Sequence, residues 1–438
     1  MKMSALLDVN VVAHETADDV NVLLELHAPA AAANTRAPAS LQIVLDRSGS
    51  MQGPPLEGAK RALIELVRRL EPTDNFGLVT FDDQAQVIVP AGPLTDREAV
   101  VAAIMGVRPG GSTDLGAGYL RGLRELRRVA AAAGAGGTLL VVSDGHVNHG
   151  MSDAAQFGDV AAAAASDRIV TSTLGYGRRY DETLLTALSR GGNGNHVFAD
   201  DPDSASAAIA GEVDGLLEKV AQGVTLTVMP RDAVSFVRLY NDLPAHQLAD
   251  GSIMIEIGDL YAAESRKLLL TLRVPGLSAL GLATVAELDL AYVELPGLVE
   301  QTVLQPIAVN VVPGDEAAGR VPHPVVRSEV LFQEAQDSKK KASEAFESGD
   351  VDGGSTHLSE ARTRLSEALA GAPDEVVADL SQELDEITAM EERTRFEGSA
   401  FMSKMTRESH HQMNRKRGRT QRPSRGPSDR RPSEDGDA

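Results

Sequence analysis

The residues best suited to chemistry follow a short apolar segment in the first part of the chain. Residues 41–45 read Leu-Gln-Ile-Val-Leu, which predicts a buried strand, and Asp46, Ser48 and Ser50 come directly after it. Carboxylate and hydroxyl oxygens are hard donors, which suit Mg²⁺ better than Zn²⁺ or copper. The spacing therefore indicates part of a magnesium site, although each of these residue types is also a common helix cap.

Two later segments supply donors that a six-coordinate ion would still need. Thr113 lies in the sequence Gly-Gly-Ser-Thr-Asp, and Asp144 lies in Ser-Asp-Gly. An Asp-x-Ser-x-Ser motif followed by such a Thr and such an Asp resembles the metal-ion-dependent adhesion site (MIDAS) of von Willebrand factor type A (VWA) domains. All five positions of that motif are present, and the chain is most similar to the intracellular bacterial type.

The resemblance implies how such a site would work. The hydroxyls of Ser48, Ser50 and Thr113 would coordinate the ion directly. Asp46 and Asp144 would act mostly through bound water. Neutral ligands leave the ion most of its charge, so its open position would take an Asp or Glu side chain from a partner protein. The expected cofactor is Mg²⁺, with Mn²⁺ or Ca²⁺ as alternatives, and analogy with bacterial relatives suggests an AAA+ ATPase as a partner.

The order of the predicted elements brings these segments together. Residues 41–220 alternate strands and helices, which is typical of a Rossmann-like, doubly wound α/β domain, with residues 85–89 as an antiparallel edge strand. Sheets of this kind bind ligands at the carboxyl ends of their strands. Asp46 and Asp144 each follow a parallel strand, and Thr113 precedes a helix on the return path, so all three are expected at the same edge.

Three further segments surround this domain. The β-like pattern of residues 221–314 predicts an antiparallel β-sandwich, and residues 1–40 contain two similar segments that would complete it. The α/β domain would then be inserted in the sandwich. Residues 325–401 predict a helical segment that packs on the rest of the chain, since only one tetratricopeptide-like repeat is visible. Residues 402–438 are polar and basic, which predicts a disordered tail.

Composition limits other classes of function. The chain has 438 residues and no Cys, which excludes disulfides, thiolate metal sites and Cys nucleophiles. Its net charge of −21 argues against nucleic-acid binding, except weakly through the basic tail. No segment approaches the ~18 apolar residues of a membrane helix, and the first residues do not fit a signal peptide. A cytoplasmic protein without membrane contact is expected.

Other candidates for chemistry are weaker. His146 and His149 lack the third donor that a zinc site needs, and they are expected to line the edge of the magnesium site. Ser48 and Ser50 lie outside any Gly-x-Ser-x-Gly elbow of the kind that hydrolases use. The chain also has no Gly-x₄-Gly-Lys-Ser/Thr motif for nucleotide phosphates.

The sequence therefore predicts a metal-dependent protein-binding module without catalytic activity. In the alternative interpretation, the protein is a scaffold that binds partners through its C-terminal helices, and the metal site is only structural. A third interpretation is a metallohydrolase in which the bound ion activates water.

Overall fold

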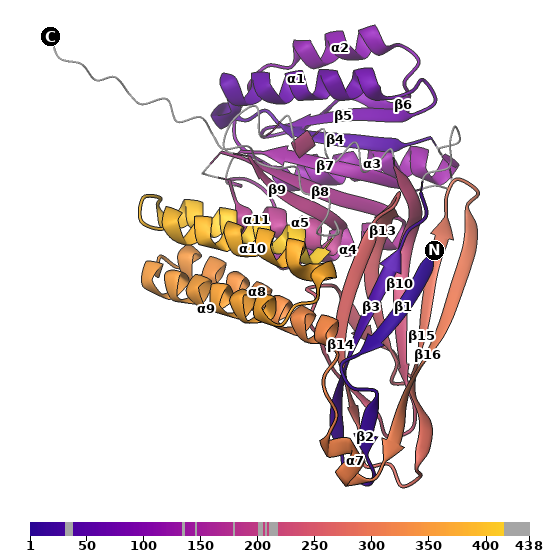
Figure 1. The fold of residues 1–438 in the computed structure, drawn as a ribbon. Coiled ribbons are helices and arrows are strands. Elements are labelled where there is room, and N and C mark those ends of the chain that lie inside the picture. Colours follow the sequence, from indigo (N-terminus) through magenta and orange to yellow (C-terminus); the bar gives the residue numbers. More distant parts are fainter. Residues whose placement is uncertain are drawn as a thin grey trace, which may run out of the picture.

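The computed structural model describes residues 1–30, 38–133, 136–144, 147–177, 180–199, 205, 208–209 and 218–415 (Figure 1). An α/β domain lies at one end of the molecule, and two β-sheets extend away from it (Figure 1). A layer of helices lies beside both parts (Figure 1). The chain therefore folds into three regions that contact one another.

The α/β domain is built on a six-stranded sheet with the strand order β6-β5-β4-β7-β8-β9. The strands are β4 (Ser40–Asp46), β5 (Asn75–Phe81), β6 (Ala85–Pro93), β7 (Gly137–Ser143), β8 (Ile169–Tyr176) and β9 (Asn193–Ala199). Neighbouring strands are parallel except for β5 and β6, which are antiparallel. This confirms the predicted doubly wound sheet and its antiparallel edge strand.

Helices cover both faces of this sheet. They are the 3₁₀ turn η1 (Gly49–Met51) and the helices α1 (Pro54–Arg69), α2 (Arg97–Gly106), α3 (Leu115–Ala133), α4 (Ala154–Ser166) and α5 (Glu182–Gly191). One hydrophobic cluster joins α1 and α2 to the sheet, and a second joins α3, α4 and α5 to its other face. Because both faces are covered, β4, β7 and β8 are buried along their whole length. Helix α3 packs tightly against β4 at Gly122, where an added Cβ would lie only 2.3 Å from Cγ2 of Val44.

The remaining strands form two further sheets. One contains β1 (Lys2–Leu7), β3 (Asp18–His27), β14 (Ser265–Val274) and β11 (Ser235–Leu239). The other contains β12 (Ala245–Gln247), β13 (Ile253–Tyr261), β10 (Lys219–Pro230), β15 (Gly281–Glu294), β16 (Val299–Val312) and β2 (Val11–Ala13). A single hydrophobic cluster takes residues from both sheets, among them Leu24 of β3 and Leu226 of β10.

The N-terminal strands pair with strands that follow the α/β domain in the sequence. Strand β3 is antiparallel to β14 over ten residue pairs from Asp18 to His27. Strand β2 pairs with β16, but this short pairing is parallel, which differs from the antiparallel pattern that the sequence predicts. The chain therefore leaves these sheets after β3, builds the α/β domain, and returns to them at β10.

The C-terminal region is helical, as predicted. It contains α7 (Gly314–Ala318), α8 (Pro324–Glu347), α9 (Val351–Ala370), α10 (Asp374–Arg393) and α11 (Ser399–Arg415). Helices α8 and α9 form a hairpin that turns at Gly349, whose φ of 83° suits glycine. Val325 and Val326 of α8 share a cluster with Leu23 of β3 and Leu269 of β14, which anchors the hairpin on the sheets.

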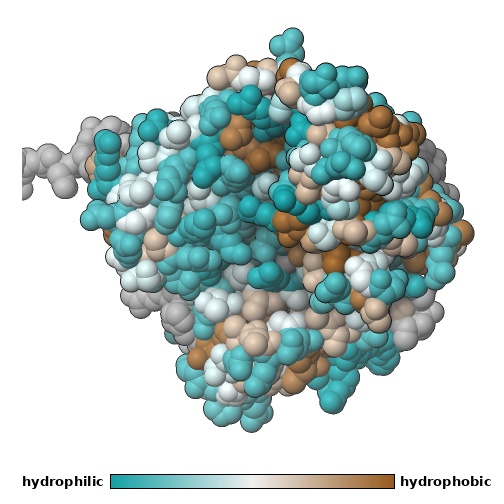
Figure 2. Space-filling view, turned by 90° about the horizontal axis from the view of Figure 1, so that it is seen from below, coloured by the Kyte–Doolittle hydropathy of each residue, from teal (hydrophilic) through white to brown (hydrophobic). Residues whose placement is uncertain are grey.

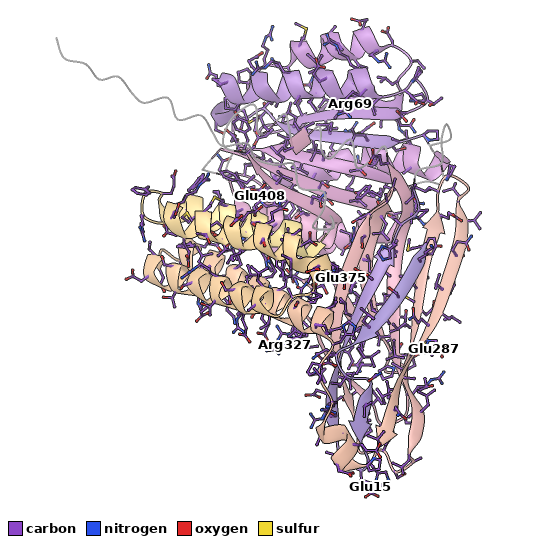
Figure 3. The ribbon with its side chains drawn as sticks, in the orientation of Figure 1. Glu15, Arg69, Glu287, Arg327, Glu375 and Glu408 are labelled. Atoms are coloured by element: carbon purple, nitrogen blue, oxygen red, sulfur yellow. The ribbon has the colours of Figure 1, made fainter. Side chains whose placement is uncertain are left out.

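The predicted disordered tail is wrong for residues 402–415, which belong to α11. Three apolar residues of this helix, Phe401, Met402 and Met405, join the cluster on one face of the α/β domain. Several of its polar residues, such as Lys404 and His410, are buried too, and Glu408 lies toward the α/β domain (Figure 3). The high charge of this segment thus reflects buried ion pairs rather than disorder. Residues 416–438 of the predicted tail lie outside the described residues.

Among the described residues, no helix has both the length and the apolar character needed to cross a bilayer. Seen from below, hydrophobic residues are interspersed with hydrophilic ones over the sheets and helices (Figure 2). Single exposed apolar residues are normal on protein surfaces.

Candidate metal centre

The two carboxylates of the predicted site lie at the same edge of the sheet. Asp46 is the last residue of β4, and Asp144 follows Ser143, the last residue of β7. These two strands are parallel neighbours, with Leu45 paired to Val142. Because parallel neighbours end at the same edge, the sheet alone brings both acids together.

A chain of hydrogen bonds joins four of the five predicted residues. The Ser48 N–H donates to Oδ1 of Asp46 at 2.8 Å. The hydroxyl oxygens of Ser48 and Ser50 lie 3.1 Å apart, and the Ser50 hydroxyl donates to Oδ1 of Asp144 at 2.8 Å. Ser143 also donates to Oδ2 of Asp46, at 2.6 Å. The sequence analysis missed this role of Ser143, although its place at the end of a strand beside Asp144 is the signal that could have indicated it.

Thr113, the fifth predicted residue, lies on the adjoining loop. Its side chain is buried, and its N–H donates to Oδ1 of Asn148 at 2.8 Å. The loop is tied to the Asp46–Ser50 segment by two backbone hydrogen bonds, from Gly49 N to Gly111 O at 2.9 Å and from Gly110 N to Arg47 O at 2.6 Å. Asn148 is a second residue that the sequence analysis missed, because no short motif links it to Thr113.

The electrostatics of the site favour a bound cation. Asp46 is completely buried, and burial raises the pKa of its carboxyl group despite hydrogen bonds from Ser143 and Ser48. Burial also raises the pKa of Asp144 to about 6, and the negative charge of Asp46 adds to this shift. No Lys or Arg side chain in the described ranges forms an ion pair with either carboxylate. Two neighbouring acids therefore lack a counter-charge that a divalent ion would supply.

The donor types also fit magnesium. Two carboxylates and three hydroxyls provide only oxygen ligands, and Mg²⁺ prefers oxygen and keeps several waters. Within the part of the chain that the structure describes, no group of three or more His, Asp or Glu side chains could hold a metal ion. An ion held at this edge would therefore need oxygens beyond the two carboxylates, such as hydroxyls or water.

The neighbouring residues have simpler roles. Asp114 caps α3, because its Oδ1 accepts the Ala117 N–H at 2.9 Å. Its other oxygen lies 3.2 Å from Nδ1 of His149. His146, the other histidine considered for zinc, lies outside the described residues.

Comparisons with known proteins agree with this fold. Residues 41–210 match the family model of the von Willebrand factor type A domain. The protein sll0103 from Synechocystis sp. is 29% identical over 173 residues, which cover 39% of this chain and 40% of that protein. The chain thus spans less than half the length of that protein and of other curated relatives that it matches.

Two solved structures share the fold of nearly the whole chain. A von Willebrand factor type A protein from Catenulispora acidiphila has a TM-score of 0.67 at 16% identity, covering 86% of this chain and 88% of its own. The ArnB paralog VWA2 from Sulfolobus acidocaldarius has a TM-score of 0.63 at 13% identity, covering 94% and 98%. The sequence match and the shared fold together identify the α/β domain of this chain as a von Willebrand factor type A domain.

Proposed function

We propose that the VWA domain is a protein-binding module that holds Mg²⁺ and grips an acidic side chain of a partner protein. The proposed ligands, which are those of the MIDAS motif, are Asp46, Ser48, Ser50, Thr113 and Asp144. The observation that carries the proposal is the unbroken chain of hydrogen bonds from Asp46 through Ser48 and Ser50 to Asp144. This chain collects oxygen donors from two loops around two acids that lack a counter-charge.

The gradient of burial indicates where a partner would approach. Asp46, Ser48 and Thr113 are buried, whereas Asp144 is half-buried and Ser50 is exposed. The buried residues would hold the inner side of the ion, and the side near Ser50 and Asp144 stays open to solvent. Bound Mg²⁺ would supply a positive charge with a free coordination position on that open side. A carboxylate is the protein group that such a position accepts best.

Binding is better supported than catalysis. Within the described residues, neither Ser48 nor Ser50 has a hydrogen bond to a His that could serve as a base. A hydrolase would need such a base or a metal-activated water beside a substrate pocket. We therefore propose no enzymatic activity for this domain.

The scaffold alternative predicts a different metal dependence. If partners bound through the C-terminal helices, they would stay bound when the metal is removed. Much of the apolar surface of α8 and α11 is used within the molecule, in clusters with the VWA domain and the sheets. This leaves the helical layer with few apolar residues for an external partner, which favours the VWA domain as the binding region.

The test is partner capture with and without metal. The immobilised full chain is incubated with cell lysate in Mg²⁺, and retained proteins, including any AAA+ ATPase, are identified after elution with EDTA. The proposal predicts that the double variant Asp46→Ala with Ser48→Ala retains none of the EDTA-eluted proteins. Asp74→Asn, a buried acid at the opposite end of β5, is the matched control and should behave as wild type. Equal retention in EDTA, or by the double variant, would instead support the scaffold.

A further inference from the structure

The loop that carries Thr113 has no regular structure of its own. Residues 107–114 lie between α2 and α3 and belong to neither a helix nor a strand. The position of the Thr113 hydroxyl therefore depends on contacts that this loop makes with its neighbours. These contacts include the two backbone hydrogen bonds to the Asp46–Ser50 segment and a set centred on a residue outside the MIDAS motif.

That residue is Asp82, which begins the turn between β5 and β6. Its side chain is only 6% exposed, and its Oδ2 lies 2.9 Å from Nη2 of Arg47, the residue between Asp46 and Ser48. The Gly111 N–H also donates to the Asp82 carboxylate. One buried carboxylate thus contacts two of the loops that carry the proposed ligands.

The backbone of Asp82 adds a further attachment. Its carbonyl oxygen accepts the N–H of Asp114, the residue after Thr113, at 2.7 Å. Its own turn is fixed by the Gln84 N–H, which donates to Oδ1 at 3.0 Å. Asp82 is therefore held rigidly by its turn and fastens the loop on either side of Ser112 and Thr113.

Gly110 shows how tightly the loop lies on this carboxylate. A Cβ added at Gly110 would lie 1.9 Å from Oδ2 of Asp82, so any larger residue would push the two apart. A backbone that passes this close to a buried charge accepts little displacement. A shift of the Asp82 side chain would therefore shift the loop as well.

We infer that Asp82, paired with Arg47, is the positioning residue that places the Thr113 hydroxyl in the metal site. Asp82 is not a ligand in this arrangement, because its oxygens are engaged by Arg47, Gly111 and Gln84. Residues that orient metal ligands typically alter metal affinity about 10- to 100-fold when they are changed. The inference rests on the proposed function, since it assumes that Thr113 is a ligand.

The test is a double-mutant cycle on Mn²⁺ affinity, measured on the full chain by electron paramagnetic resonance of free Mn²⁺. Asp82→Asn should weaken binding about 10-fold or more relative to wild type. In the Thr113→Val background, the same change should cost less than about 3-fold, because there is no hydroxyl left to position. In the Ser50→Ala background, Asp82→Asn should weaken Mn²⁺ binding as much as it does in wild type. The inference would be overturned if Asp82→Asn reduced Mn²⁺ affinity equally in wild type and in the Thr113→Val background, or if it did not reduce the affinity of wild type at all.

Two controls keep this test decisive. Asp74→Asn changes a buried acid just before β5, which accepts the N–H groups of Ala39 and Glu71 at 2.7 Å each, and it should leave Mn²⁺ affinity unchanged. If Asp82→Asn loses its circular dichroism spectrum, Arg47→Gln replaces it, with the same expected losses. Failure of the proposed function is distinguishable, because wild type would then bind no Mn²⁺ or Asp46→Ala would bind it normally.

Discussion

Acid should weaken the fold through a buried histidine near the contact between α11 and the VWA domain. His196 of β9 is only 1% exposed, with Nδ1 2.8 Å from Oγ1 of Thr173 and Nε2 3.2 Å from the Tyr180 hydroxyl. Burial lowers the pKa of His196 to about 3, and the cations Arg407 and Lys404 of α11 contribute to the shift. The folded protein therefore keeps this ring neutral in mildly acidic solution.

The sign of the effect follows from the protons bound in each state. In the unfolded chain, the His196 ring is protonated below about pH 6.5, whereas in the folded chain it is protonated only near pH 3. Between these values the unfolded state binds more protons, so stability is fully present above pH 6.5 and falls as the pH drops. At pH 4.5 the ring is two units below its unfolded pKa, which corresponds to a loss of about 2.7 kcal/mol.

The assay is urea unfolding of wild type and His196→Gln at pH 7.5 and pH 4.5. Carboxyl groups with raised pKa values act in the opposite direction, but they are common to both proteins and cancel in the comparison. Wild type should lose about 2.7 kcal/mol more than the variant between the two pH values. His246→Gln, a change at an exposed histidine of β12, should follow wild type. An identical pH response of His196→Gln and wild type would refute the reasoning.

Three further predictions concern the packing of the domains. Gly122→Val should destabilise the protein by about 1–3 kcal/mol in urea unfolding, because α3 could no longer approach Val44. Lys404→Met should cost about 1.5–3 kcal/mol by the same measurement, since Nζ lies 3.1 Å from the Tyr180 carbonyl oxygen and 3.6 Å from Glu182. Deletion of residues 404–438 should expose apolar surface to the dye ANS, whereas deletion of residues 416–438 should leave ANS fluorescence and Mn²⁺ affinity unchanged.

The α/β domain was predictable because its signals are local. Apolar runs such as residues 41–45 and 138–142 can be buried strands only if helices cover both faces, which fixes the layered arrangement. Parallel neighbours then place Asp46 and Asp144 at one edge without further information. The shared position of the two carboxylates was predictable for the same reason, since each lies at the end of a parallel strand.

The features that the sequence analysis missed depend on distant contacts. Helix α11 has the composition of a solvated tail, and its burial depends on partners on the VWA domain and on α8, such as Glu182 for Arg407 and Ser343 for Ser403, at 3.1 Å each. Asp82 reads as an ordinary turn residue, because its contact with Arg47 spans 35 positions along the chain and no short motif records it. The parallel pairing of β2 with β16 is equally non-local.

The most direct test of the metal site is crystallography of the full chain grown in Mn²⁺, with anomalous difference maps collected at the manganese edge. The proposed function predicts one strong peak at the carboxyl ends of β4 and β7, about 2.0–2.3 Å from the hydroxyl oxygens of Ser48, Ser50 and Thr113. The same crystals of Asp46→Ala should show no peak there. A wild-type map without density among these oxygens, or with its only peak elsewhere, would contradict the proposed function.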